Sequence, residues 1–311
     1  SVMSAWGALR LAVPALVAHQ SYSPLSVPLL HQDHAEVAAG ALIDAAAAAG
    51  ARVLSLPAMT LAGPAFTALS QAMAQRRLHP VIHDQHARAA FDATQDVEPY
   101  LRAGLGGKRL KELRRQRNRL ADEGMVAFAI ATAPAAVMAA LERFLVLEAQ
   151  GWKGASGTSL GQNPAHAGFI RAAAKGLSAT GRIEIAELTL DEALIASGIV
   201  IRQGSQALFF KIAYDEGYAR FSPGVQLTLE LTYHFAADPA ITLVDSTADA
   251  GHPMIDHLWQ ERLAVGDLLI PTTSNDSIAG AIIAMMGARR SIRSQAKAVL
   301  HRLRHQKEKR A

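Results

Sequence analysis

A turn that leads into a helix is the first feature of this chain that could do chemistry. Residues 219–224 read Ala-Arg-Phe-Ser-Pro-Gly and continue into the apolar helical segment 225–235. Backbone N–H groups at a helix start are unpaired and favour anions, and a glycine lets a ligand approach closely. We expect a phosphate-bearing ligand here, with a plain strand-to-helix turn as the alternative. The expected cofactor-binding residues of the turn are Arg220, Phe221, Ser222, Pro223, Gly224, Val225 and Gln226.

Carboxylates set among apolar residues are the candidate general bases. Glu148 follows Val137 by eleven residues and continues the apolar stripe of its helix, and Asp245 ends the apolar segment 241–245. Burial raises the pKa of a carboxyl group towards neutral pH. A carboxylate with such a pKa can act as a general base that takes a proton from the reacting group of a substrate. Glu148 could instead be a structural ion-pair partner or a charge at a helix end. Asp215 either adds a catalytic carboxylate or caps a turn.

A loop rich in Gly and Ser follows Glu148 and carries Trp152 and Lys153 as candidate substrate-binding residues. A Trp side chain can pack on a sugar ring or on a pantetheine arm. Lys153 could hold a phosphate or neutralise Glu148, and a loop that only packs is the alternative. The candidates for protonating a leaving group are Tyr218, which we retain as catalytic, Tyr214 and His252.

Basic residues form two clusters. Residues 108–119 hold seven Lys or Arg against one Glu, and residues 289–310 hold nine against Glu308. Such clusters favour acidic partners such as a nucleotide, an anionic glycan, RNA or a membrane surface, and a solvated helix face is the alternative. Arg109, at the start of the first cluster, is a candidate for binding a substrate phosphate.

Length and composition limit the class of protein. The chain has 311 residues, which favours two domains. No apolar run approaches the ~20 residues that span a bilayer, so we expect a cytoplasmic protein. The absence of cysteine excludes disulfides and thiolate chemistry. His79, His83 and His86 resemble a metal motif, but on a strand the third would point to the opposite face, so no metal is expected.

Periodicity and turn signals place these residues on an alternation of helices and strands. The chain up to residue 98 reads as a weak α/β layer, and three antiparallel strands follow one another between residues 182 and 215. The expected helices are 35–49, 64–76, 108–123, 135–149, 225–235 and 254–262. The expected strands are 27–30, 52–56, 81–91, 125–131, 182–190, 193–202, 207–215, 241–245 and 263–270.

From residue 99 to 270 this order resembles the GNAT acyltransferase superfamily. The nearer likeness is to a bacterial acetyltransferase group associated with cellulose and exopolysaccharide biosynthesis, which is in turn similar to the Fem-type peptidyltransferases with two GNAT-like halves. The segments that carry it are KRLKELRRQRNRL (108–120), LEAQGWKGASGTSL (147–160) and YDEGYARFSPGVQL (214–227). One departure is that a single glycine, Gly224, follows Arg220 where GNAT loops have two.

The resemblance implies an α/β (α+β) fold with a mixed, mostly antiparallel sheet flanked by helices. It implies a degenerate GNAT-like half at 1–98, an acyltransferase domain at 99–270 and a basic tail at 271–311. A backbone N–H near a break in the strand before the turn would bind the donor carbonyl, and the acyl chain would lie between that strand and 241–245. The strand residues so implied are Lys211, Ile212 and Ala213.

The function so implied is direct acyl transfer from acetyl-CoA, or another acyl-CoA, to a hydroxyl or amine of a saccharide or saccharide precursor. One alternative is a Fem-type aminoacyl or peptidyl transferase that uses charged tRNA. Another is a non-catalytic partner of a membrane-associated polysaccharide synthase. The basic tail would allow peripheral binding at the inner membrane.

Overall fold

The structure is a computed structural model and describes residues 4–6, 11–18 and 22–288. The chain divides into two compact units, residues 1–86 with 264–311 and residues 87–263. The boundaries expected from the sequence lie instead at 98 and 270. The difference arises because both unit boundaries fall inside strands, β5 (Val81–Asp92) and β11 (Glu261–Pro271). These strands have no Pro-, Gly- or Ser-rich linker sequence that would mark a boundary. The basic tail from residue 289 lies outside the described residues.

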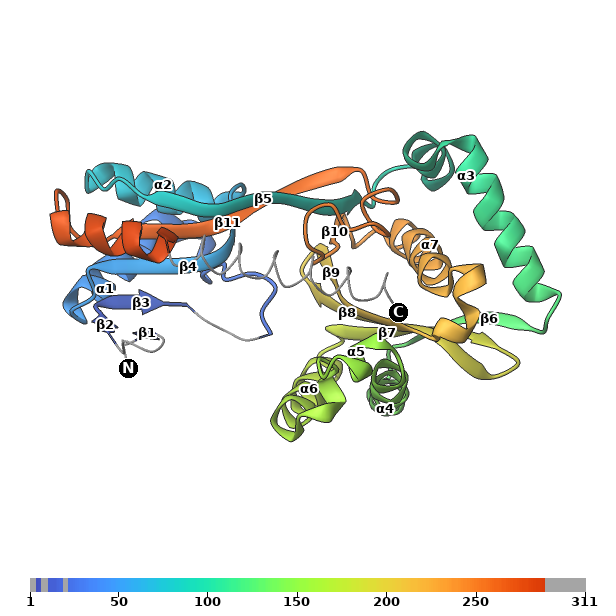
Figure 1. The fold of residues 1–311 in the computed structure, drawn as a ribbon. Helices are drawn as coiled ribbons and strands as arrows, with labels where there is room; N and C mark the ends of the chain where they lie inside the picture. The colour runs from blue at the N-terminus through green and yellow to red at the C-terminus, as the bar shows by residue number, and fades with distance from the viewer. Residues whose placement is uncertain (1–3, 7–10, 19–21, 289–311) are drawn as a thin grey trace, which may run out of the picture. The chain divides into compact units, whose positions relative to one another are not determined.

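The unit of residues 87–263 is built on a strongly curved sheet (Figure 1). Its strand order is β5-β10-β9-β8-β7-β6. All neighbours pair antiparallel except β9 and β10, which are parallel. The strands after β5 are β6 (Val126–Ala131), β7 (Ile183–Leu190), β8 (Ala193–Gln203), β9 (Gln206–Tyr214) and β10 (Leu243–Asp245). The three-stranded meander expected from the sequence is therefore confirmed.

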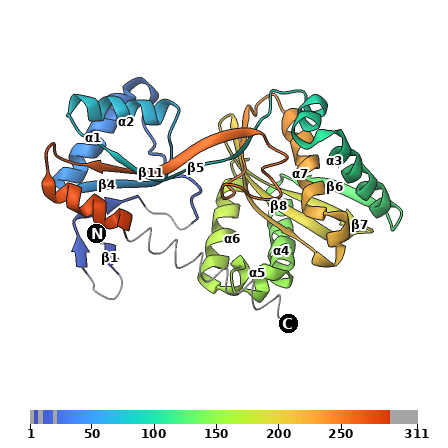
Figure 2. The same ribbon diagram turned by 45° about the horizontal axis from the view of Figure 1, so that its top comes forward.

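Helices cover both faces of this sheet (Figures 1 and 2). One face carries α3 (Val97–Ala121) and α7 (Pro223–Ala236), and the other carries α4 (Pro134–Gln150), the short α5 (Trp152–Ala155) and α6 (Pro164–Ser178). A 3-10 turn, η3 (Leu160–Gln162), precedes α6, and another, η4 (Glu216–Phe221), precedes α7. The core under α7 contains Leu227, Leu231, Phe235, Val200, Phe209 and Trp259.

The apolar stripe of α4 decides how that helix packs. Val137, Leu141, Phe144 and Leu145 recur at helical spacing, and all four are buried. Glu148 continues the same stripe and is buried with them. The sequence prediction that Glu148 continues the apolar stripe of its helix is therefore confirmed.

The other unit contains a smaller α/β layer. Strand β4 (Val53–Thr60) pairs parallel with β3 (Ala15–Val17) and antiparallel with β11. The remaining elements are β1 (Ser4–Trp6), β2 (Leu11–Val13), η2 (Gln32–His34), α1 (Ala35–Ala48), α2 (Pro64–Gln75) and a helix at residues 277–288. Ile43, Leu54 and Leu69 are among its buried core residues. Its descent from a degenerate GNAT-like half stays a prediction.

Three expectations about local structure are wrong. Residues 254–262 form turns followed by the start of β11 rather than a helix, although Ile255, Leu258 and Trp259 bury their side chains at a spacing that imitates one. Residues 27–30 form no strand. Helix α6 was not expected, because Gly and Ser dominate the preceding loop. Among the described residues, no helix is both long and apolar enough to cross a bilayer.

Candidate functional site

Strands β9 and β10 part and open a cleft. Their parallel pairing covers Gln206–Leu208 and Leu243–Asp245, after which the chain leaves β10 at Ser246. The cleft beyond this point has a volume of about 390 Å³, within the roughly 300–1,000 Å³ of small-molecule sites. It is lined by Lys153, Phe209, Phe210, Lys211, Ile212, Ser246, Thr247, Ala248, Asp249, His252, Met254 and Ile255.

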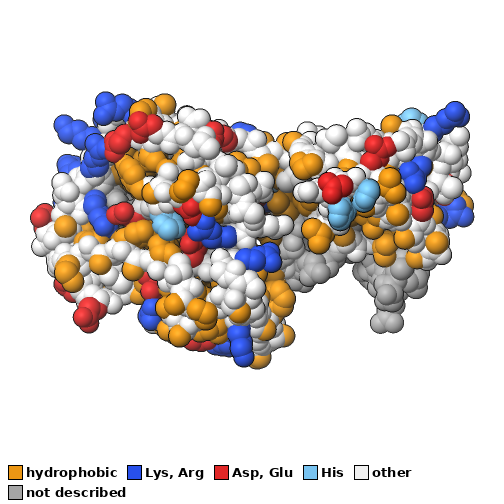
Figure 3. Space-filling model, turned by 180° about the vertical axis from the view of Figure 1, so that it is seen from behind, with side chains coloured by type: hydrophobic (Ala, Val, Ile, Leu, Met, Phe, Trp, Pro, Cys, Tyr) orange, Lys and Arg blue, Asp and Glu red, His pale blue; other side chains and the backbone are white. Residues whose placement is uncertain are grey.

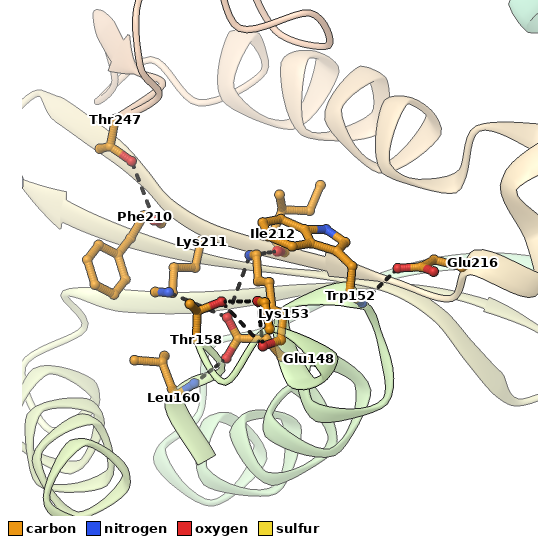
Figure 4. A network of polar contacts seen from close by, with 11 residues as sticks. Glu148, Trp152, Lys153, Thr158, Leu160, Phe210, Lys211, Ile212, Glu216 and Thr247 are labelled. Atoms are coloured by element: carbon orange, nitrogen blue, oxygen red, sulfur yellow. Dashed lines mark hydrogen bonds and ion pairs between the residues drawn. The ribbon is translucent and has the colours of Figure 1, made fainter. Parts of the chain in front are cut away.

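A β-bulge at Phe210 marks where β9 leaves its regular course. Ile199 of β8 pairs with Lys211, but the next residue, Val200, pairs with Phe209, so Phe210 is the extra residue. A bulge leaves one residue out of the ladder and bends the strand. The Thr247 hydroxyl donates to the Phe209 carbonyl at 2.8 Å, and it lies 3.4 Å from the carbonyl oxygen of Phe210, the bulged residue labelled in Figure 4. The break expected in this strand is thus present, immediately before the predicted residues Lys211, Ile212 and Ala213.

Glu148, Lys153 and Lys211 form a charged group beside the cleft, here called the Lys153 cluster (Figure 4). Oε1 of Glu148 lies 3.4 Å from Nζ of Lys211 and 3.6 Å from Nζ of Lys153. Oε2 of Glu148 accepts the N–H of Leu160 at 2.8 Å, and the Glu148 side chain is 0% exposed. Both lysines also line the cleft. With both lysines protonated, two cations would face one anion.

The surroundings of Lys153 favour loss of its proton. Burial lowers the pKa of Lys153, and the nearby charge of Lys211 lowers it further, whereas Glu148 acts to raise it. The Nζ atom of Lys153 also donates to the carbonyl oxygen of Ile212, at 2.7 Å. The neutralising contact between Lys153 and Glu148 that the sequence suggested is therefore present.

Trp152 lies beside this cluster but faces solvent. The residue is 56% exposed, and its backbone N–H donates to Glu216 Oε1 at 2.8 Å. Nζ of Lys153 lies 5.9 Å from the centre of the Trp152 ring. Trp152 is thus exposed next to a residue that lines the cleft, and its role in packing on a ligand stays a prediction.

The predicted phosphate turn offers few free donors. Ser222 N–H donates to Ala219 and Gln226 N–H donates to Ser222, while Pro223 has no N–H. Among the described residues, no acceptor is found for the N–H groups of Gly224 and Val225 in the first turn of α7. Two amides are thus left without a protein acceptor in the described part of the chain, although Gly224 is buried.

The side chains of this turn point elsewhere. Arg220 pairs with Glu123 at 2.6 Å, and Gln226 donates to the carbonyl of Leu113 at 2.9 Å. A methyl group at Gly224 would lie 3.2 Å from the Tyr214 ring, so side chains already occupy the space beside the turn. The turn therefore offers a diphosphate fewer contacts than the sequence suggested.

The other predicted catalytic residues lie outside the cleft lining. Asp245 is buried, where Oδ2 pairs with Arg88 and Oδ1 accepts the Thr247 N–H at 2.8 Å. Asp215 caps η4 by accepting the Gly217 N–H at 2.8 Å, which matches the turn-capping alternative. Tyr218 packs partly buried against the core, and Arg109 is exposed on α3.

Sequence reasoning missed the side chain of Lys211 as a member of the site. Lys211 was expected only as a backbone contact to the cofactor, yet its ammonium meets Glu148. The available signal was its position as the lone charge in the apolar segment 206–214. Of the possible proton donors, His252 lines the cleft, and the described residues contain no cluster suited to a metal ion.

The sequence and the fold were compared with those of known proteins. No curated protein sequence matches the chain. Residues 107–251 match the family described as acetyltransferase (GNAT) domain. A structure of FemX superposes with a TM-score of 0.51 at 8% identity, covering 86% of this chain and 82% of that one. A conserved protein of unknown function from Bacteroides thetaiotaomicron gives 0.50 at 14%, covering 76% and 74%.

L-PGS from Bacillus licheniformis gives a TM-score of 0.47 at 14% identity, covering 81% of this chain and 77% of that one. Identities this low bear on the fold alone. The expected mixed α/β, GNAT-like fold is confirmed, and residues 107–251 are similar to the acetyltransferase (GNAT) domain family. The association with cellulose or exopolysaccharide biosynthesis stays a prediction.

Proposed function

We propose that this protein is an acyltransferase that binds the acyl arm of an activated donor between β9 and β10. The observation that carries this proposal is the parting of these strands at the Phe210 bulge, with the Lys153 cluster beside the opening. Backbone groups of β9 near Lys211 and Ile212 would orient the donor carbonyl, and a desolvated site strengthens such contacts. The donor we propose is acyl-CoA, with acetyl-CoA as the first candidate.

The charge of the cleft bears on the acceptor. Two lysines and one carboxylate give the Lys153 cluster a net positive charge when both lysines are protonated. Such a charge would repel a protonated amine. Because burial and Lys211 favour the neutral form of Lys153, the cluster takes up this charge only when it accepts a proton, as it would from a hydroxyl or an uncharged amine. This supports an acceptor that reacts through a hydroxyl or a neutral amine, and we propose a saccharide or saccharide precursor on the basis of the sequence resemblance.

Binding and transfer with acetyl-CoA test the proposal directly. Titration calorimetry of the full chain should show saturable binding, and mass spectrometry should detect acetylated product with saccharide acceptors. Replacing Ala248, which lines the cleft, by Trp should abolish binding, because the indole would fill the opening. Ala172→Trp on the exposed face of α6 is the matched control and should bind normally. No binding of acetyl-CoA by the wild type at millimolar concentration would exclude this donor.

Aminoacyl transfer from charged tRNA is the second candidate. Figure 3 shows Lys and Arg side chains gathered over α3, where the exposed cations include Arg102, Lys108 and Arg109. Such a surface could hold phosphates of RNA. Salt-sensitive tRNA binding together with indifference to acetyl-CoA would favour this candidate. Binding of neither donor would favour a non-catalytic partner role.

A further inference from the structure

We infer that the amine of Lys153 is the general base of the cleft, and that Glu148 positions it rather than accepting the proton itself. This inference rests on the proposed acyl transfer. It differs from the expectation that a carboxylate, Glu148 or Asp245, does this work. The reason is that an acyl acceptor bound in the cleft can approach Lys153 but not the two carboxylates.

The two predicted carboxylate bases have no such face. Oε1 of Glu148 meets the two lysines, and its Oε2 accepts the N–H of Leu160, while the whole side chain is enclosed. Asp245 is enclosed in the same way by Arg88 and the N–H of Thr247. A general base must come within hydrogen-bond reach of the proton that it accepts. An acceptor in the cleft cannot approach either carboxylate without displacing these partners.

Lys153 does reach the cleft, and its partners leave one position open. An ammonium has three N–H groups, and the neutral amine keeps two of them and gains a lone pair. Nζ of Lys153 has two acceptors from the protein nearby, the carbonyl of Ile212 at 2.7 Å and Oε1 of Glu148 at 3.6 Å. A neutral amine can donate one N–H to the Ile212 carbonyl and still lie in ion-pair range of Glu148. Its lone pair is then free for a group bound in the cleft that Lys153 lines.

The charges around Lys153 favour the neutral form. Burial is the largest influence lowering its pKa, Lys211 on β9 lowers it further, and Glu148 on α4 opposes both. From the chain after β10, Asp249 and His252 face the same cleft. The Trp152 ring lies on the solvent side. Among these groups His252 is the rival base, since it also lines the cleft.

The transfer balances with this assignment. The acceptor oxygen forms a bond to the acyl carbon of a thioester donor as its proton passes to Nζ of Lys153. The bond between that carbon and the donor sulfur breaks. The proton on Lys153 then passes to the departing sulfur, so Lys153 returns to the neutral amine. An uncharged amine acceptor would follow the same course.

The first test measures the protonation of Lys153 without catalysis. Competitive acetylation of the full chain with acetic anhydride across a pH series, read by peptide mass spectrometry, gives the pKa of each lysine. Lys153 should titrate below the exposed Lys175 of α6. Glu148→Gln should lower the pKa of Lys153 further, because it removes an opposing charge. Lys211→Met should raise it, because it removes a like charge.

The same variants test catalysis. The pH at which kcat/KM reaches half its plateau should move in opposite directions in Glu148→Gln and Lys211→Met, following the labelling result. Lys153→Arg places a permanent cation at this position that cannot act as a base near neutral pH, so kcat should fall about 100-fold or more. Donor binding should change little. Lys175→Met is the matched control and should leave both readouts unchanged.

Several outcomes would overturn the base assignment. The first is that Lys153 labels with the same pH dependence as Lys175, and the second is a Lys153→Arg variant with normal kcat. The third is that Glu148→Gln and Lys211→Met shift the pH dependence of kcat/KM in the same direction. The fourth is that only His252→Asn removes the fall of kcat/KM at low pH. A wild type that transfers no acyl group would overturn the proposed function and this inference with it. A wild type that transfers normally beside an equally active Lys153→Arg would overturn the base assignment alone.

Discussion

The Lys211 ammonium lies 3.4 Å from Oε1 of Glu148, although 63 residues separate them along the chain. Glu148 lies in the apolar stripe of α4, and this counter-charge comes from β9 of the neighbouring sheet rather than from α4 itself. Taking a charge out of water is costly unless partners replace the water. The two lysines and the Leu160 N–H do so here, which makes the stability of this unit depend on Glu148.

Glu148→Ala should destabilise the unit of residues 87–263 by about 3 kcal/mol, because it leaves two half-buried lysines facing each other and the Leu160 N–H without an acceptor. Glu148→Gln should cost less, since its amide oxygen can still accept that N–H. Urea unfolding followed by fluorescence of the buried Trp259 would measure the difference. Equal stabilities of the two variants and the wild type would contradict this account of the cluster.

The buried pair of Arg88 and Asp245 should be structural rather than catalytic. Both side chains are almost fully enclosed, and they join β5 to β10. Asp245→Ala should destabilise the unit by about 3–5 kcal/mol, because it removes the carboxylate that offsets a buried arginine charge. The double variant Arg88→Met with Asp245→Leu should recover most of that loss.

Activity separates this role from that of a base. Asp245→Asn, measured below its unfolding temperature, should keep the wild-type pH dependence of kcat/KM. If Asp245→Asn changed how kcat/KM falls at low pH while circular dichroism showed an intact fold, Asp245 would again be a candidate base.

Stability should fall at high pH because of Tyr100. Its hydroxyl donates to Glu261 Oε2 at 2.6 Å and accepts the Gln260 N–H at 2.6 Å. Burial raises the pKa of Tyr100 well above its usual value of about 10, and the Glu261 hydrogen bond adds to this. Above pH ~10 the unfolded chain loses this proton while the folded chain keeps it. The contribution is therefore complete below pH ~10 and is lost as the pH rises further.

The measurement is the urea unfolding free energy of the wild type and of Tyr100→Phe between pH 8 and pH 11. One proton of difference corresponds to a slope of about 1.4 kcal/mol per pH unit. Other tyrosines and lysines also titrate in this range, so the informative quantity is the difference between the two proteins. The Phe variant should be less stable at pH 8 and should lose stability less steeply. Parallel pH profiles would refute the role given to Tyr100.

Local signals in the sequence were sufficient for the elements that hold the site. The spacing of Val137, Leu141 and Phe144 placed the buried face of α4 and put Glu148 on it. Two apolar runs around a glycine turn placed β8 and β9. In each case the sequence pattern spans only about ten residues. Over that length the spacing of apolar side chains is enough to distinguish a helix from a strand.

The cleft itself depends on contacts that no local pattern encodes. The Phe210 bulge is a register shift against Ile199 and Val200 of another strand. Asp245 was predicted as a base because it ends a buried strand, but its partner Arg88 lies 157 residues away. The apparent helix at 254–262 failed for a related reason, because Trp259 and its neighbours are buried by long-range packing that happens to share a helical spacing.

Gly154 should be indispensable for the position of Lys153. It is buried in α5, and a methyl group on it would lie 1.8 Å from the carbonyl oxygen of Ala149, a backbone atom that cannot move aside cheaply. Gly154→Ala should therefore displace α5 and destabilise the unit by about 1–3 kcal/mol. Gly168→Ala is the matched control, because no atom lies within 4 Å of the added methyl on α6. It should stabilise that helix by about 0.5–1 kcal/mol.

Unfolding followed by Trp259 fluorescence would compare the stabilities of the two alanine variants. Competitive labelling would show whether Lys153 has moved. In Gly154→Ala the amine of Lys153 should lose its buried contacts with Ile212 and Glu148, so the pKa of Lys153 should return towards that of an exposed lysine. In Gly168→Ala the labelling of Lys153 should match the wild type. A Gly154→Ala protein with wild-type stability and an unshifted Lys153 would show that α5 adapts to the methyl group and does not fix the lysine.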